Sequence, residues 1–254
     1  MSAAIEIAVH DLRRMFAGPL AWSALAVLQL VLGLFFFLTF LWDFGHKQAL
    51  LVGAKSSVGI TAYVAAPLFK TTVLLMTLLL PVLSMRTLAE ERRNGTMVLL
   101  LSSPVSMSAI VLGKYLSLLA FMAMITLLVS LMPLSLALGG TLDFGLLGSA
   151  MLGLFLSLAT FSAAGVYASS LTRQPGTAAI ATLAILLTLW FAHTSSTGLD
   201  GSAAQVLAWL SLTRHVDALM RGVFSSSDIA YFIILITTFL IFAVRRLDAL
   251  RLGE

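Results

Sequence analysis

Six long apolar runs divide this sequence and restrict what it can fold into. They cover residues 20–41, 67–85, 109–133, 145–171, 177–192 and 229–244. A helix needs about 20 apolar residues to cross a bilayer core of about 30 Å, and the two shortest runs still approach that length. Backbone polar groups in lipid must be hydrogen-bonded within the chain. We therefore predict that each run is a transmembrane helix.

The composition agrees with a membrane protein. Hydrophobic residues make up 60% of the chain and charged residues 10%, whereas a soluble domain carries about 25% charged residues. The apolar residues form continuous runs rather than the stripes expected of a soluble all-α core. We predict an all-α integral membrane protein with six spans in a single domain, residues 1–254.

The basic residues indicate the orientation of the spans. Six spans place both termini on one side, and cytoplasmic loops carry an excess of Lys and Arg. With cytoplasmic termini, the inner side carries Arg13, Arg14, Arg86, Arg92, Arg93, Lys114, Arg173, Arg245, Arg246 and Arg251, and the outer side only Lys47, Lys55, Lys70, Arg214 and Arg221. We expect cytoplasmic termini and an inner (cytoplasmic) membrane location. This sidedness also explains the net charge of +4 without any binding of nucleic acid.

An amphipathic helix is predicted over residues 4–16, before the first span. Its apolar residues at helical spacing are Ile5, Val9, Leu12 and Phe16, and its polar ones are Glu6, His10, Arg13 and Arg14. A helix of this kind lies in the plane of the membrane interface, in contact with lipid. Pro19 follows at the start of the first span, where its missing N–H costs nothing.

The sequence carries no motif of a membrane enzyme, and we expect no catalytic residue, metal site or cofactor in this chain. It has no His-Glu-x-x-His motif and no Gly-x-x-x-x-Gly-Lys-Ser/Thr phosphate loop. The paired glutamates Glu90 and Glu91 resemble those of an intramembrane protease family, but the arginine expected four residues later is Gly95. If ATP drives this protein, another chain binds the ATP and Mg²⁺.

Few charges fall within the predicted spans. Lys70 and Lys114 lie near span ends, where we expect their long side chains to reach water. No Asp or Glu falls in the middle of a span. This argues against an ion-coupled transporter, which usually needs such groups.

The loop between the second and third spans, residues 86–106, is the strongest candidate for a functional site. It opens with a charge cluster, Glu90, Glu91, Arg92 and Arg93, followed by the turn signal Asn94-Gly95. Thr96 can cap a short apolar helix that contains Leu99 and Leu100, and Ser103 and Pro104 would end it. An apolar helix of this length cannot span the membrane, so it either docks in a groove of a partner or lies in the headgroup layer.

The segment 194–228 is predicted to enter the outer leaflet as one or two half-length helices. Its apolar residues alternate with charges that make a full crossing costly. The residues that we expect to form an outer gate are Trp209, Leu212, His215, Asp217 and Arg221. Ser227 or Asp228 is expected to cap the last span.

Together these segments resemble a known family. Glu-Glu-Arg-Arg-Asn-Gly-Thr at 90–96, Leu-Leu-Leu-Ser-Ser-Pro-Val at 99–105 and Leu112-Gly113-Lys114 resemble the type-two ATP-binding-cassette (ABC) exporter permeases, most nearly the gliding-motility GldF-like group. The N-terminal residues 11–22 and the stretch 215–232 are also similar to that group. One position departs from it, because the glutamate expected two residues after Thr96 is Val98.

The resemblance implies a permease that works as a dimer with two cytoplasmic ABC ATPase subunits. The loop 86–106 would contain the coupling helix, and the residues after Trp209 the outer gate. A periplasmic auxiliary protein is a further partner that family analogy allows. Two alternatives stay open at this point: an ion-coupled secondary transporter, and a membrane scaffold subunit without its own pathway.

Overall fold

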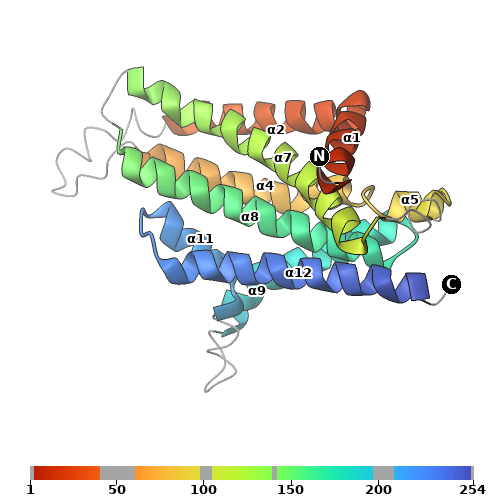
Figure 1. The fold of residues 1–254 in the computed structure, drawn as a ribbon. Coiled ribbons are helices and arrows are strands. Elements are labelled where there is room, and N and C mark those ends of the chain that lie inside the picture. The colour runs from red at the N-terminus through yellow and green to blue at the C-terminus, as the bar shows by residue number, and fades with distance from the viewer. Residues whose placement is uncertain (1–2, 41–60, 98–104, 139–141, 197–208, 253–254) are drawn as a thin grey trace, which may run out of the picture.

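The fold is an all-helical bundle. The computed structural model describes residues 3–40, 61–97, 105–138, 142–196 and 209–252, and this part of the chain contains no strand. Long helices run side by side, with α1 (Ala3–Ala17), α5 (Ala89–Arg93) and both termini at one end (Figure 1). The short helix α11 (Leu212–Met220) lies toward the opposite end. We refer to these as the α5 end and the α11 end.

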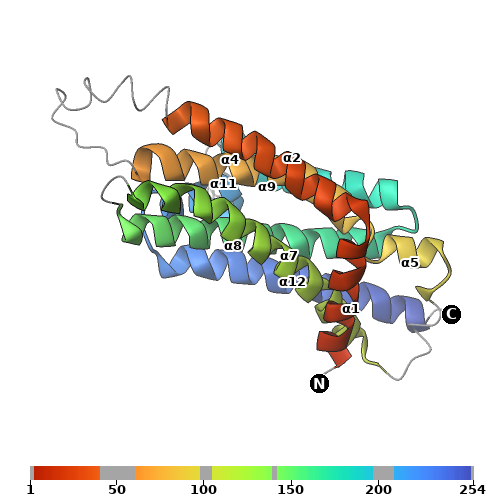
Figure 2. The same cartoon turned by 90° about the horizontal axis from the view of Figure 1, so that it is seen from above.

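Six helices are long and apolar enough to cross a membrane, as the sequence predicts. They are α2 (Pro19–Phe37), α4 (Ala66–Ser84), α7 (Met107–Ser135), α8 (Phe144–Leu171), α9 (Pro175–Ser196) and α12 (Ser226–Leu252). A π-helical turn, η2 (Thr61–Ala65), precedes α4, and a 3-10 turn, η3 (Leu136–Leu138), follows α7. The view in Figure 2 shows the same bundle from above.

The helices extend beyond the apolar runs at several ends. The second helical segment begins at Thr61 rather than at residue 67, because η2 leads directly into α4. The last helix continues past residue 244 through Arg245 and Arg246 to Leu252. An apolar run reports the part of a helix that suits hydrocarbon, whereas the helix itself can continue into water.

Helix α8 lies at the centre of the bundle and contacts α4, α7, α9, α11 and α12. Two of its glycines permit close approach. A Cβ atom at Gly153 would lie 2.9 Å from the Leu219 side chain, and one at Gly165 would lie 2.5 Å from the Ser84 side chain. Gly153 and Gly165 therefore serve packing within the subunit.

Helix α1 crosses the α5 end of the bundle and packs mainly against α7 (Figure 2). Gly113 makes this contact possible, because a Cβ atom there would lie 2.8 Å from the Ile7 Cβ atom. The four apolar residues predicted to share one face are divided. Leu12 and Phe16 pack against the core, whereas Ile5 and Val9 are exposed.

Candidate functional site

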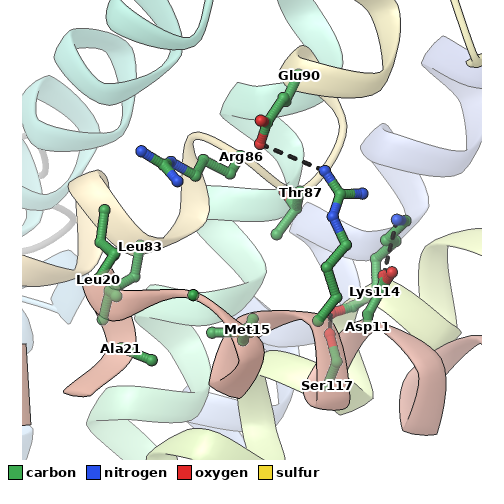
Figure 3. Close-up of a pocket in the computed structure, with 12 residues that line it drawn as sticks. Asp11, Met15, Leu20, Ala21, Leu83, Arg86, Thr87, Glu90, Lys114 and Ser117 are labelled. Carbon is green, nitrogen blue, oxygen red and sulfur yellow. Dashed lines mark hydrogen bonds and ion pairs between the residues drawn. The ribbon is translucent and has the colours of Figure 1, made fainter. Parts of the chain in front are cut away.

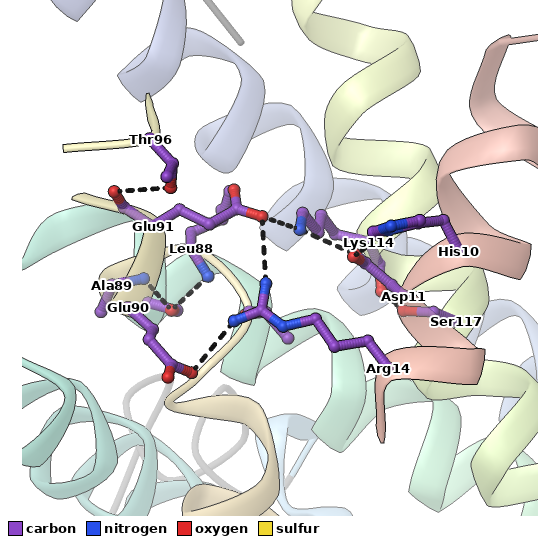
Figure 4. A network of polar contacts seen from close by, with 12 residues as sticks. His10, Asp11, Arg14, Leu88, Ala89, Glu90, Glu91, Thr96, Lys114 and Ser117 are labelled. Carbon is purple, nitrogen blue, oxygen red and sulfur yellow. Dashed lines mark hydrogen bonds and ion pairs between the residues drawn. The ribbon is translucent and has the colours of Figure 1, made fainter. Parts of the chain in front are cut away.

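A cluster of five charged residues joins α1, α5 and α7 (Figure 4). We call it the charged junction, and its members are Asp11, Arg14, Glu90, Glu91 and Lys114. Lys114 lies at its centre and is 2% exposed. The expectation that Lys114 reaches water is wrong, because α1 and α5 cover it and supply its partners. Its ammonium nitrogen lies 2.7 Å from Asp11 Oδ2 and donates a short hydrogen bond to Glu91 Oε1.

Glu91 is the most constrained carboxylate of the charged junction. One of its oxygens accepts from Lys114, and the other is buried with no hydrogen-bond partner among the described residues. Glu91 lies on α5, beyond the end of α4.

Arg14 adds a second, looser connection between α1 and α5. Its guanidinium lies 3.6 Å from Glu90 Oε2 and 3.9 Å from Glu91 Oε1. Arg14 is about half exposed, so this pair is weaker than the buried one at Lys114. The two contacts tie the N-terminal helix to the loop that follows α4.

The same loop is also fastened to the end of α8. The Ser169 hydroxyl accepts hydrogen bonds from the backbone N–H groups of Leu88 and Ala89, at 3.1 and 2.9 Å. Arg92 donates to the Ser170 carbonyl at 2.8 Å. These bonds fix the start of α5 against a helix that lies about 80 residues away in sequence.

The described part of this loop contains a helix that the sequence did not predict. The charge cluster itself forms α5 over Ala89–Arg93. Arg93 is exposed, Gly95 adopts the positive φ of 74° that a turn requires, and the Thr96 hydroxyl donates to the Glu91 carbonyl. The predicted short helix around Leu99 and Leu100, with Ser103 and Pro104, lies outside the described residues.

At the α11 end, one predicted gate residue, His215, is buried, and another, Trp209, contacts it. His215 is 5% exposed, and its Nδ1 lies 2.6 Å from Asp228 Oδ1 on α12. Its Nε2 donates to the Trp209 carbonyl at 3.0 Å, and its ring stacks on Tyr231 at 4.0 Å. Leu212 is buried in the core. This cluster holds α11 and the residues before it against α12.

The other two predicted gate residues lie at the surface. Asp217 pairs with Lys70 of α4 at 2.8 Å, and Arg221 is exposed at the end of α11. Asp228 does not cap α12, since its side chain pairs with His215. Ser225 caps α12 instead, because its hydroxyl accepts a hydrogen bond from the Ser227 N–H at 3.3 Å.

The sequence reasoning missed several residues of these two clusters. Asp11, Lys114 and Ser169 at one end, and Tyr231 at the other, were not recognised as site residues. A lysine inside an apolar run was the available signal for Lys114, because such a charge requires a partner. Among the described residues, no cluster of His, Asp or Glu could hold a metal ion.

The fold and the two clusters define a multi-span helical membrane protein with a charged, structured loop at the end where both termini lie. The sequence model of the family described as "ABC-2 family transporter protein" matches residues 5–249, nearly the whole chain. The chain therefore belongs to this family of ABC-2 transporter membrane proteins. No curated protein matches the chain significantly.

Family membership makes the chain the membrane component of a transport system and implies an ABC ATPase subunit as its partner.

Proposed function

We propose that this chain is the permease subunit of an ABC exporter, that it forms the translocation path as a dimer, and that it belongs to the GldF-like group. ATP and Mg²⁺ would be bound by separate ATPase subunits that dock at the α5 end. The proposal also places the chain in the inner membrane with both termini in the cytoplasm. The excess of basic residues on the predicted inner side supports this orientation.

The connection of the α5 loop to three helices is the observation that carries this proposal. Lys114 and Arg14 tie α5 to α7 and α1, and Ser169 and Arg92 tie it to α8. A force applied to a loop held in this way is transmitted to the helices rather than absorbed by the loop. This is the property that a coupling element requires.

In the proposed mechanism, closure of the ATPase pair pushes on residues 86–106. The charged junction moves α1, α7 and α8 with the loop, and the two permeases rock about their interface. Rigid-body motion of this kind is a common switching mode. The cluster around His215 at the α11 end would then form the gate that opens to the outside.

The N-terminal helix α1 is proposed to lie in the membrane interface. Its exposed apolar residues Ile5 and Val9 would enter the headgroup region, and its exposed Arg13 would face water or lipid phosphate. In this position α1 would brace the charged junction against the membrane surface.

The test replaces two apolar residues of the loop by charges in the same chain, Leu99→Glu with Leu100→Glu. An apolar docking segment that becomes charged should lose its partner, with ATPase affinity reduced by about 30-fold or more. Co-purification of the ATPase and its ATP turnover in proteoliposomes are the measurements. The matched control is Val223→Glu with Phe224→Glu, two exposed neighbours at the α11 end.

Unchanged co-purification and turnover in the loop variant would refute the coupling assignment. The rival functions give different results in the same vesicles. Flux driven by an ion gradient with the chain alone would identify a secondary transporter. Complex assembly without any ATP-dependent flux would identify a scaffold.

A further inference from the structure

A pocket opens at the charged junction, between the α5 ends of α1, α2, α4 and α7 (Figure 3). Its volume is about 130 Å³, well above the roughly 10–15 Å³ that one water molecule requires. Leu20 and Leu83 form its apolar side, and Lys114 with Asp11 forms the opposite side. The pocket is therefore apolar on one side and charged on the other, as a site for an amphiphile would be.

Among the described residues, charge pairing leaves one cation of this pocket without a partner. Lys114 is paired with Asp11 and Glu91, and Arg14 with Glu90. Arg86 forms no ion pair or hydrogen bond among the described residues, and its side chain is exposed. In Figure 3 it extends away from the Lys114–Asp11 pair, toward Leu20 and Leu83. A ligand with one negative charge would complement it.

An apolar stripe leads along α4 to Arg86. Leu74, Leu78 and Val82 are 48%, 58% and 41% exposed and follow one another at intervals of four residues, so they share one helix face. Arg86 follows four residues later, just beyond the end of α4. At 1.5 Å per residue the path from Leu74 to Arg86 is about 18 Å long. One leaflet of the hydrocarbon core is about 15 Å thick.

We propose that this pocket binds an anionic phospholipid. The headgroup phosphate would lie on Arg86, and one acyl chain along Leu74, Leu78 and Val82. A lipid fits better than a soluble anion because the cation stands at the end of an apolar stripe one leaflet long. The site goes beyond the proposed transport function and does not depend on it, since it needs neither the ATPase nor a second permease.

The test uses the full chain in phosphatidylcholine nanodiscs that contain a small fraction of brominated phosphatidylglycerol. The natural sequence has no cysteine, so Val82→Cys carries a single bimane fluorophore that bromine quenches. Ile241→Cys on α12 is the control position, because Ile241 is exposed as Val82 is. Each of the two residues also lies four positions before an arginine, Arg245 and Arg86 respectively. If a lipid binds, bimane at residue 82 should be quenched at an about tenfold lower phosphatidylglycerol fraction than bimane at residue 241. A tenfold gain in affinity is what one charge-assisted contact is expected to give.

Arg86→Gln in the same background should remove this preference, whereas Arg246→Gln, an exposed arginine of α12 away from the pocket, should leave it unchanged. Equal quenching at the two positions, or a preference that survives Arg86→Gln, would overturn the lipid site. Loss of the preference on adding excess inorganic phosphate would show a site for the free anion rather than for a lipid. None of these results depends on whether the ATPase docks.

Discussion

Lys114 shows how one residue can determine the structure of a whole junction. It lies at the position where a long apolar helix meets two charged segments, and its burial is tolerated because two carboxylates face it. Removing one partner from a buried pair leaves an uncompensated charge, which costs more than the pair itself contributes. The residue therefore couples α1, α5 and α7 through a single ammonium group.

This leads to a stability prediction for Lys114→Met. The substitution leaves Asp11 and Glu91 facing each other without a cation, and we expect a loss of about 3–5 kcal/mol in the free energy of unfolding. Thermal or denaturant unfolding of the purified chain in detergent measures it. Lys70→Met is the control, since its partner Asp217 is partly exposed, and it should cost at most about 1 kcal/mol. Equal losses in the two variants would contradict the buried junction.

At the scale of elements, helix contacts depend on glycines at specific positions. Gly113 admits α1 against α7, Gly153 admits α11 against α8, and Gly165 admits α4 against α8. A Cβ atom at Gly148, also on α8, would meet nothing within 4 Å, so this glycine plays no such role. The same residue type therefore has different consequences along one helix.

Gly113→Ala should separate α1 from α7. Its Cβ atom would meet the Ile7 side chain at 2.8 Å and the Ala4 carbonyl at 2.9 Å, and overpacking of this kind costs about 1–3 kcal/mol. We therefore expect a cysteine at Ala8, a partly buried position of α1, to react with a thiol reagent at a higher rate. Gly148→Ala serves as control and should leave that rate unchanged. A rate that does not respond to Gly113→Ala would show that α1 is held elsewhere.

The sequence predicts the spanning helices well because their cause is local. The length and apolarity of each run are enough to predict a helix in lipid, and the six runs coincide with α2, α4, α7, α8, α9 and α12. The tertiary contacts could not be predicted from the sequence. Nothing in the neighbourhood of Lys114 reveals that Asp11, about a hundred residues earlier, is its partner. The charge cluster at residues 90–93 is recognisable from the sequence, but the bonds from Leu88 and Ala89 to Ser169 and from Arg92 to the Ser170 carbonyl depend on α8.

At the scale of the whole molecule, the two ends of the bundle have different chemistry. The α5 end gathers both termini and the charged junction, whereas the α11 end holds the buried His215–Asp228 pair and its aromatic neighbours. The proposed mechanism requires such an asymmetry, because the ATPase would act on one end and the gate would open at the other.

The proposed orientation predicts opposite labelling of the two ends. Single cysteines at Arg93 and Arg221, both exposed, should react with a membrane-impermeant thiol reagent from opposite sides. In intact cells Arg221→Cys should be labelled from the outside and Arg93→Cys only after the membrane is opened. Labelling of Arg93→Cys in intact cells would reverse the topology and with it the site of ATPase docking.

Site-specific photo-crosslinking tests the central claim most directly. A photoreactive amino acid replaces Arg93 on α5 in one sample and Arg221 at the α11 end in the other, and each is irradiated in membranes that contain the ATPase. If the ATPase docks at the α5 end, the chain with the probe at residue 93 should form a covalent product with the ATPase, and the chain with the probe at residue 221 should not. A product from residue 221, or none from residue 93 while the ATPase still co-purifies, would contradict it.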